Sequence, residues 1–256
     1  MFGYSLVVAA STCDLSLGLT ETGILASAPF AGVLFAFPWG YYADTRGRRR
    51  ALLLSTGIGF LFAALSSFAG SWQFMLIVKL LGCSFSTASF TLAMTLLGEC
   101  TDTRHRSRYL FIMMSFNLAS EFVSFALAYM VLSLEFRIPI PWMGITYRPW
   151  RLFTLIMALP LGGGALLMYY LYESPKYLAN KGESAKALDV LQKIYEFNGG
   201  KRENYPVHHI VTPHDGLNEN QSFWSSVIKH PVPIFRPPLL KITGKLFFLM
   251  ALCCSV

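Results

Sequence analysis

The sequence predicts an all-α membrane protein, and three observations support this prediction. Of its 256 residues, 54% are apolar and 14% charged, whereas a soluble domain carries roughly 25% charged residues. The mean hydropathy is +0.47. The apolar residues gather in runs about as long as the roughly 20 residues that a helix needs to cross a bilayer.

The remaining composition argues against other classes of protein. A net charge of +7 would suit nucleic-acid binding, but the basic residues lie in short segments between apolar runs, so we expect no nucleic-acid partner. The five cysteines do not form the pattern of a disulfide framework. No Gly-rich phosphate loop, Ser/His/Asp set or paired carboxylate indicates an enzyme or a cofactor. His208, His209 and His214 lack the spacing of a metal site.

Five apolar runs are long enough to cross a membrane. Residues 1–12 are too short and end at the polar break Cys13-Asp14-Leu15. We interpret them as the end of a first helix, with a surface-lying segment as the alternative. The fifth run is expected to be broken at Pro160 and the glycines at 162–164. The five predicted spans are Gly23–Tyr42, Ala51–Ala69, Trp72–Gly98, Tyr109–Ser133 and Leu152–Tyr172.

The composition divides the chain into three parts. These are a transmembrane bundle over 1–172, a polar central loop over 173–241 and the start of another apolar run over 242–256. In the central loop, apolar residues recur at helical spacing over Ser184–Phe197. This spacing predicts a short amphipathic helix at the membrane surface or against the bundle. Phe223–Ile228 is expected to form a second short helix.

The basic residues predict the orientation in the membrane. The segments 42–50, 99–108 and 173–241 hold 4, 3 and 9 Lys and Arg residues, and the opposite loops hold Arg137, Arg148 and Arg151. The positive-inside rule therefore places the three segments in the cytoplasm. Leu134–Trp150, on the other side, is expected to be a loop with interfacial aromatic residues. A plasma membrane and an intracellular vesicle membrane both fit a multi-pass protein of this kind.

The stretch Gly40–Arg50 lies between two apolar runs and contains four arginines, one carboxylate and two glycines. The chain must turn there outside the hydrocarbon, and Gly47 can take positive φ at no steric cost. We expect Asp44 to face the N-terminus of the next helix and the arginines.

Small side chains recur every four residues along the first predicted span, at Ala28, Gly32, Ala36 and Gly40. This spacing places them on one helix face. We expect that face to pack closely against a neighbouring helix.

Three motifs resemble the major facilitator superfamily. The pattern Gly-x-x-x-Asp-(Arg/Lys)-x-Gly-Arg-Arg, between helices 2 and 3 of that family, matches Gly40, Asp44, Gly47, Arg48 and Arg49. Glu99 and Arg106 resemble the loop between helices 4 and 5. The stretch from Tyr172 through Glu173 to Leu178 resembles the signature after helix 6. The layout looks closest to synaptic vesicle glycoprotein 2-like and organic-ion-transporter-like members.

The resemblance implies the N-terminal six-helix half of a twelve-helix protein, in which two halves rock about a central site. It also implies ion pairs that hold the cytoplasmic side shut when the transporter faces outward. The alternative is that the arginines only fix topology and bind anionic lipids. The residues of this expected gate are Gly40, Asp44, Gly47, Arg48, Arg49, Glu99, Arg106 and Glu173.

Two charged residues fall inside predicted spans. Glu121 shares a helix face with Asn117 and Ser124, so we expect a wall of the solute pathway there, or a hydrogen bond between helices from a protonated carboxyl. Lys79 lies about 10 Å below the outer surface. In proton-coupled relatives the fourth-helix arginine works with an acidic residue of helix 1. A lysine that snorkels to the headgroups is the alternative.

Three functions remain open at this point. The first is transport of a small solute, of organic-ion or sugar-like character, by alternating access. The second is a membrane scaffold that does not transport, and the third is a truncated product without function. We expect that this chain alone does not transport, because it lacks most of helix 1 and helices 8–12.

Overall fold

The computed structural model describes residues 2–33, 36–207, 209–210, 240, 243–245 and 248. The chain forms two compact units, Met1–His214 and Asp215–Val256. The named helices and strands all belong to the first unit. The helix expected at 223–228 and most of the apolar run at 242–256 lie outside the described residues.

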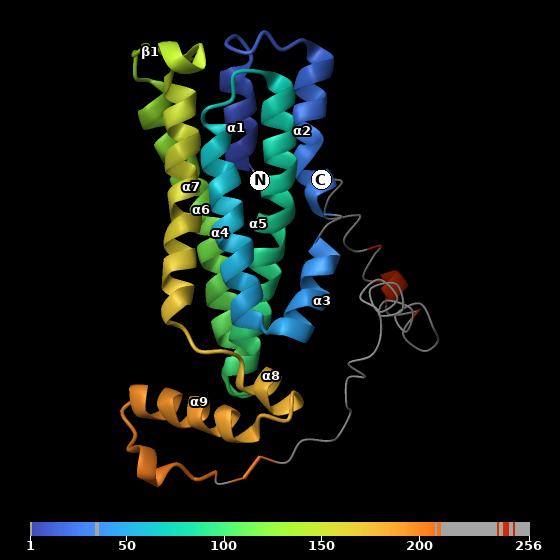
Figure 1. Cartoon of the computed structure of the whole chain (residues 1–256), viewed down its shortest axis with the longest axis vertical. Helices are drawn as coiled ribbons and strands as arrows, with labels where there is room; N and C mark the ends of the chain where they lie inside the picture. The colour runs from blue at the N-terminus through green and yellow to red at the C-terminus, as the bar shows by residue number, and fades with distance from the viewer. Residues whose placement is uncertain are drawn as a thin grey trace. The chain divides into compact units, whose positions relative to one another are not determined.

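The first unit is a bundle of long helices with one small hairpin (Figure 1). The hairpin strands are β1 (Ile138–Ile140) and β2 (Ile145–Tyr147). Short 3-10 turns occupy Pro141–Met143 and Arg202–Asn204. The helices are α1 (Phe2–Ser11), α2 (Leu19–Val33), α3 (Ala36–Arg46), α4 (Arg48–Ser66), α5 (Trp72–Cys100), α6 (Arg106–Leu132), α7 (Pro149–Tyr170), α8 (Pro175–Asn180) and α9 (Ser184–Phe197).

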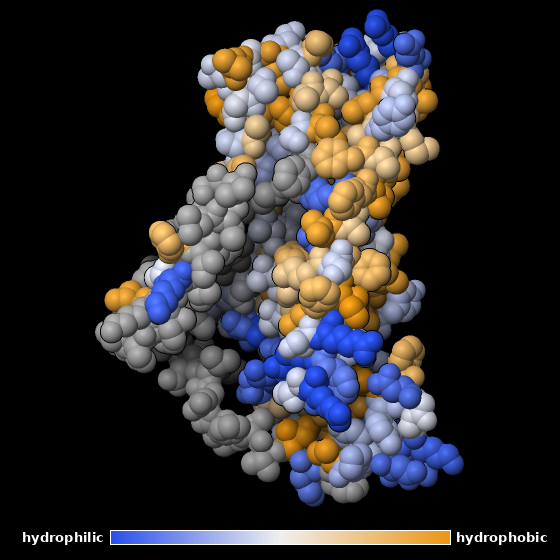
Figure 2. Space-filling model, turned by 180° about the vertical axis from the view of Figure 1, so that it is seen from behind, coloured by the Kyte–Doolittle hydropathy of each residue, from blue (hydrophilic) through white to orange (hydrophobic). Residues whose placement is uncertain are grey.

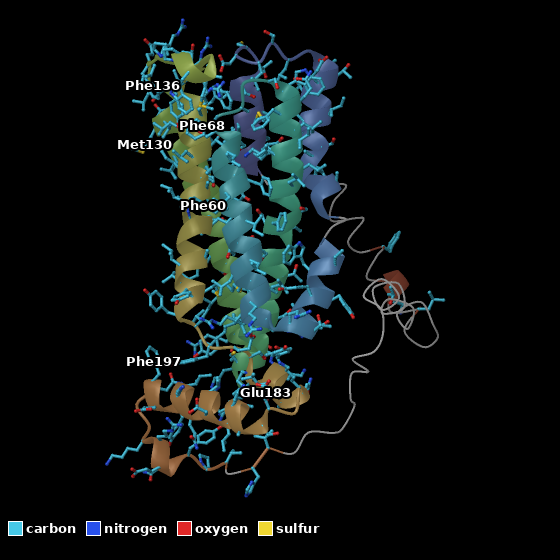
Figure 3. All side chains as sticks on the ribbon, in the orientation of Figure 1. Phe60, Phe68, Met130, Phe136, Glu183 and Phe197 are labelled. Carbon is cyan, nitrogen blue, oxygen red and sulfur yellow. The ribbon has the colours of Figure 1, made fainter. Side chains whose placement is uncertain are left out.

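The bundle has two chemically different ends. We call the end with α8 and the 46–50 arginines the basic end, and the end with β1 and β2 the hairpin end (Figure 1). Phe68 and Phe136 lie toward the hairpin end, and Glu183 and Phe197 lie at the basic end (Figure 3). Figure 2 shows hydrophobic side chains over the middle of the bundle and hydrophilic ones toward both ends.

Among the described residues, α4, α5, α6 and α7 are each long and apolar enough to cross a membrane. These helices expose more large apolar side chains than the surface of a soluble protein does. On α6, Phe111, Phe116 and Phe122 are each 73% exposed. The prediction of an all-α membrane protein is therefore confirmed, with the hairpin as a small addition.

The first predicted span, Gly23–Tyr42, is divided between α2 and α3, with residues 34–35 outside the described part. Pro29 lies inside α2. Pro38 lies in the first turn of α3, where the missing N–H has no intrahelical partner to lose.

The predicted break in the last span is wrong, because α7 runs without interruption through Pro160 and the glycines at 162–164. Membrane helices tolerate such residues where neighbouring groups satisfy the backbone. A Cβ on Gly162 would lie 2.9 Å from the Phe60 ring of α4, so this glycine makes room for an aromatic side chain. Phe60 is labelled in Figure 3.

The loop predicted at Leu134–Trp150 contains the antiparallel hairpin, in which Ile138 pairs with Tyr147 and Ile140 with Ile145. Gly144, with φ +64°, closes the turn. The sequence does not predict this hairpin, because each strand has three residues, too few for an alternating pattern.

The helix predicted over Ser184–Phe197 is α9, which runs crosswise below the bundle (Figure 1). Its Ala187 and Val190 are buried with Leu178 and Ala179 of α8. Part of its apolar stripe is therefore used against α8. Contact of α9 with a membrane surface stays a prediction.

Helices α2 and α5 approach closely at Gly32, which belongs to the predicted small-residue stripe. A Cβ there would lie 2.8 Å from the Cys83 Cβ and 3.0 Å from the Ser84 backbone nitrogen. Ala28 is also buried, whereas a Cβ on Gly40 would meet nothing within 4 Å. Ala36 begins α3.

We expect Gly32→Val to lower the free energy of unfolding by about 1–3 kcal/mol, because the added carbons force the two helices apart. Chemical denaturation in mixed micelles, followed by circular dichroism, measures the change. Gly23→Val is the matched control in α2, because a Cβ at Gly23 meets nothing within 4 Å. Equal effects of the two substitutions would contradict the close approach.

Candidate functional site

Arg48, the first residue of α4, is the centre of the basic-end cluster. It pairs with Asp44, one turn earlier on α3. Its Nη2 and Nε lie 3.3 and 3.4 Å from the two carboxylate oxygens of Glu99 on α5. The Arg48 and Glu99 side chains are 15% and 11% exposed. The guanidinium therefore joins three helices, and its pair with Glu99 is largely buried.

Glu173 connects the start of α4 to the start of α8. Its Oε1 accepts hydrogen bonds from the backbone N–H of Arg49 at 2.8 Å and of Ser174 at 3.0 Å. The Arg49 side chain donates to the carbonyl oxygens of Met168, at 3.2 Å, and Tyr169. These carbonyls belong to the last turn of α7, where the helix dipole favours a cation.

Gly47 sits in the turn between α3 and α4 with φ +108°, the positive φ that the sequence predicts. A Cβ there would overlap the Glu173 carboxylate and lie 3.2 Å from the Tyr177 ring. The Tyr177 hydroxyl donates to the Thr45 carbonyl oxygen at 3.1 Å. The turn therefore packs directly against the residues that begin α8.

Sequence reasoning missed the role of Ser174, which is fully buried. Its hydroxyl donates to Glu99 Oε2 at 2.7 Å and accepts from the Tyr177 N–H at 3.2 Å. It thus caps α8 and adds a second partner to Glu99. A serine directly before a proline is a helix-start signal that could have identified the cap.

The structure does not bring Arg106 into this cluster. Its side chain is exposed and lies 3.9 Å from where a Cβ on Gly98 would be. It forms no ion pair with another residue in the part of the chain that the structure describes. A Cβ on Gly40 would meet none of the cluster residues within 4 Å.

The predicted pathway residues occupy two places. On α6, Asn117 is exposed, Glu121 is half-buried and Ser124 is buried. A Cβ on Gly3 of α1 would lie 3.6 Å from the Ser124 Cβ, so that end of the face packs against α1. On α5, Lys79 Nζ lies 5.2 Å from the centroid of the Tyr4 ring of α1.

A second charged cluster, the Asp14 cluster, lies at the hairpin end and was missed entirely. Asp14 follows α1, and its carboxylate lies 3.0 Å from Arg148 Nε and 3.2 Å from Arg151 Nη2. It also accepts from the Trp150 indole N–H at 3.1 Å. Arg151, whose side chain is 3% exposed, lies in the first turn of α7.

Arg151 also closes the C-terminal end of α4. Its Nη1 donates to the carbonyl oxygens of Ser67 at 3.2 Å and Ala69 at 2.7 Å. In return, the Ser67 hydroxyl donates to the Arg151 carbonyl at 2.7 Å. The cluster therefore ties α1, α4 and α7 together, opposite the cluster around Arg48.

Comparison with solved structures places this arrangement among known folds. The chain aligns with the proton:xylose symporter XylE bound to 6-bromo-6-deoxy-D-glucose at a TM-score of 0.60 and 19% identity, over 75% of this chain and 46% of that one. The inward-open xylose transporter XylE from E. coli gives 0.57 at 18% identity, over 91% and 53%. These similarities show the fold.

Curated relatives are closer in sequence. Synaptic vesicle glycoprotein 2C of Mus musculus is 26% identical over 223 residues, which cover 83% of this chain and 30% of the relative. Synaptic vesicle glycoprotein 2A of Rattus norvegicus is 28% identical over 236 residues, covering 87% and 31%. This chain thus spans about a third of these relatives. The family model of the Major Facilitator Superfamily matches residues 1–256, and the chain belongs to that superfamily.

Proposed function

We propose that this chain is one half of a transporter that moves a small solute across a membrane by alternating access. Its membership of the superfamily supports this function most directly. The structural likeness to xylose transporters, which covers about half of their length, supports the division into halves. In this proposal the transporting unit needs a second half, and its solute is of organic-ion or sugar-like character.

The proposed solute pathway borders the two membrane helices that carry polar and charged side chains within their apolar runs. On α6, Asn117, Glu121 and Ser124 form one wall, and Lys79 of α5 forms another. A charged group in the hydrocarbon is costly and is usually retained for a function. The two alternatives, an interhelical hydrogen bond for Glu121 and snorkelling for Lys79, would remove these residues from the pathway.

We place the basic end at the cytoplasmic face and propose that its cluster is the frame of the cytoplasmic gate. The described pairs of Asp44, Arg48 and Glu99 all lie within this half, so they hold its helix ends in place for a second half to close against. Asp44, whose side chain is 37% exposed, and the exposed Arg106 remain accessible to such a partner. Anionic lipids at the same face would meet the other arginines.

The proposal predicts that Arg48→Gln lowers solute uptake by at least about tenfold, which corresponds to about 1.4 kcal/mol. The substitution leaves the largely buried Glu99 carboxylate without its cation. Uptake is measured in proteoliposomes that hold the full-length protein, and size-exclusion chromatography checks folding. A panel of sugars, organic cations and organic anions supplies the solutes.

Arg104→Gln is the matched control, because it removes the same charge from an exposed side chain of the same face. We expect it to leave uptake unchanged. Equal losses of uptake in both variants would show that uptake depends on the total positive charge of this face and not on the ion pairs of Arg48. Absence of uptake for every solute would reject transport and favour the membrane scaffold.

A further inference from the structure

The β1–β2 hairpin carries exposed apolar side chains outside the membrane helices. Ile138 on β1 is 55% exposed, and Trp142, in the turn between the strands, is 83% exposed; Met143 beside it is also exposed. Residues 138–147, from the start of β1 to the end of β2, contain no charged side chain. An uncharged, apolar surface of this kind marks a contact with a membrane or with another protein.

The second strand fixes the hairpin to the bundle. The Tyr147 hydroxyl lies 3.2 Å from the Ser67 hydroxyl oxygen, and the centroids of the Tyr147 and Phe68 rings are 5.9 Å apart. A Cβ on Gly70 would lie 3.3 Å from Cγ2 of Ile145. Strand β2 therefore packs against the turn between α4 and α5, and the exposed side chains belong to β1 and to the turn that follows it.

The length of α7 places the hairpin at the boundary of the hydrocarbon. At the far end of α7, Tyr169 and Tyr170 are exposed aromatic residues, of the kind that lie at a membrane interface. Counted back from Tyr170, about 20 residues at about 1.5 Å each cross roughly 30 Å of hydrocarbon and end at Arg151. Strand β2 ends at Tyr147, only four residues before Arg151. The hairpin therefore lies at the depth of the lipid headgroups.

The exposed apolar surface of the hairpin continues that of α6. In the last turn of α6, Tyr129 and Met130 are 82% and 65% exposed, and α6 is long and apolar enough to cross a membrane. Leu134, between α6 and β1, is also exposed. Phe136 lies beyond Met130 on the same side of the bundle (Figure 3). A lipid surface that covers the end of α6 therefore reaches the hairpin as well.

The backbone of the hairpin contains few donors that need water. Pairing between β1 and β2 satisfies backbone groups of both strands, and the Gly144 N–H donates to the Pro141 carbonyl oxygen at 3.2 Å. Pro139 and Pro141 have no N–H to satisfy. Because unsatisfied backbone groups are costly in apolar surroundings, this hairpin enters a membrane interface at a lower cost than an open loop.

We propose that the hairpin is a membrane-contacting element, and that its partner is the lipid surface of the leaflet at the hairpin end. Ile138, Trp142 and Met143 enter the zone between the headgroups and the acyl chains. An indole suits this zone, because its body is apolar and its N–H donates to lipid oxygens. Arg148 follows β2 and pairs with Asp14, so the lipid contact lies directly beside the Asp14 cluster. This inference does not depend on transport.

The test locates Trp142 in the 256-residue chain, held in phosphatidylcholine nanodiscs. Tryptophan labelled with fluorine-19 gives one signal for each indole, and Trp142→Phe assigns the signal of interest. A lipid with a nitroxide high on its acyl chain broadens signals that lie near the headgroups, and a gadolinium chelate in the buffer broadens signals that meet water. Trp150, which is 3% exposed at the same end, is the internal control. Dissolved fluorotryptophan amide gives the response to full exposure to water.

We expect the nitroxide lipid to broaden the Trp142 signal at least about threefold more than the Trp150 signal, because an interfacial indole touches lipid directly. The chelate should broaden the Trp142 signal at least about threefold less than that of the dissolved amide. A chelate response close to that of the dissolved amide would overturn the inference. So would a nitroxide response no larger than that of Trp150.

A pair of variants tests whether the apolar surface of the hairpin makes this contact. Ile138→Glu adds a charge to β1, and Gln73→Glu adds the same charge to an exposed side chain of α5 at the same end. We expect Ile138→Glu to lower the nitroxide broadening of Trp142 at least about twofold, because a charge resists entry into the interface. Gln73→Glu should leave the broadening unchanged. An unchanged Trp150 signal confirms that the Asp14 cluster is intact, and equal responses of the two variants would contradict the proposal.

One further outcome separates the lipid surface from a protein partner. If Trp142 meets water in nanodiscs that hold one chain, and is protected only in nanodiscs that hold two, the hairpin is an interface between copies of this chain. The lipid contact is then rejected. Protection from the chelate in nanodiscs that hold one chain, together with broadening by the nitroxide lipid, supports the lipid contact.

Discussion

Asp14→Asn is expected to lower the free energy of unfolding by about 3–5 kcal/mol, the cost of removing one partner from a buried ion pair. The asparagine keeps the shape of the side chain and one acceptor. It removes the negative charge that faces Arg151, whose side chain is 3% exposed, and Arg148. Because Arg151 also binds the Ser67 and Ala69 carbonyls, it cannot leave the cluster without exposing the end of α4.

Equilibrium unfolding in mixed micelles, followed by circular dichroism, measures this loss. Asp102→Asn is the control, since that side chain is 70% exposed and pairs loosely with His105 at 3.8 Å. It should stay within about 0.5 kcal/mol of the parent chain. An Asp14→Asn variant as stable as the Asp102→Asn variant would show that Arg151 does not need the carboxylate.

Gly47→Ala is expected to lower the free energy of unfolding by about 2–4 kcal/mol, from two sources. The backbone at Gly47 has φ +108° and ψ 145°, a conformation that residues with a Cβ rarely adopt. The new methyl group would also displace the Glu173 carboxylate. That carboxylate would then lose its hydrogen bonds from the N–H groups of Arg49 and Ser174.

Gly57→Ala in α4 provides a control of opposite sign. A Cβ at Gly57 meets nothing within 4 Å, so alanine should raise stability by up to about 1 kcal/mol through helix propensity. Repeating Gly47→Ala in a Glu173→Ala background separates the two sources. The penalty should shrink to the backbone part, and an unchanged penalty would show that the contact with Glu173 is unimportant.

The features that the sequence predicted well depend on neighbours in the chain. The turn at Gly47 and the approach of Asp44 to Arg48 follow from an eleven-residue pattern. The extent of α9 follows from the spacing of its apolar side chains. Glycine conformation, i,i+4 pairs and helical periodicity are local, so one sequence is enough to predict them.

The Asp14 cluster shows what local reasoning cannot find. Asp14 looked like a polar break, and Arg148 and Arg151 looked like ordinary loop charges. The two arginines lie 134 and 137 residues after Asp14 in the sequence, so no local spacing pattern relates them to it. The Lys79–Tyr4 contact was missed for the same reason. The unbroken α7 shows a different failure, because a membrane helix tolerates proline and glycine residues that would break a helix in water.

The contacts at the two ends of α7 can form only after this late helix has been synthesised. In the first turn of α7, Arg151 donates a hydrogen bond to Asp14, which lies 137 residues earlier in the sequence. Just beyond the end of α7, Glu173 accepts a hydrogen bond from the backbone N–H of Arg49, which lies 124 residues earlier. At translation rates of about 5–20 residues per second, Asp14 waits roughly 7–27 s for its arginines. Until then, a carboxylate and the start of α4 stay exposed to water, lipid or the insertion machinery. Arrival of α7 therefore allows both contacts to form within a few seconds of each other.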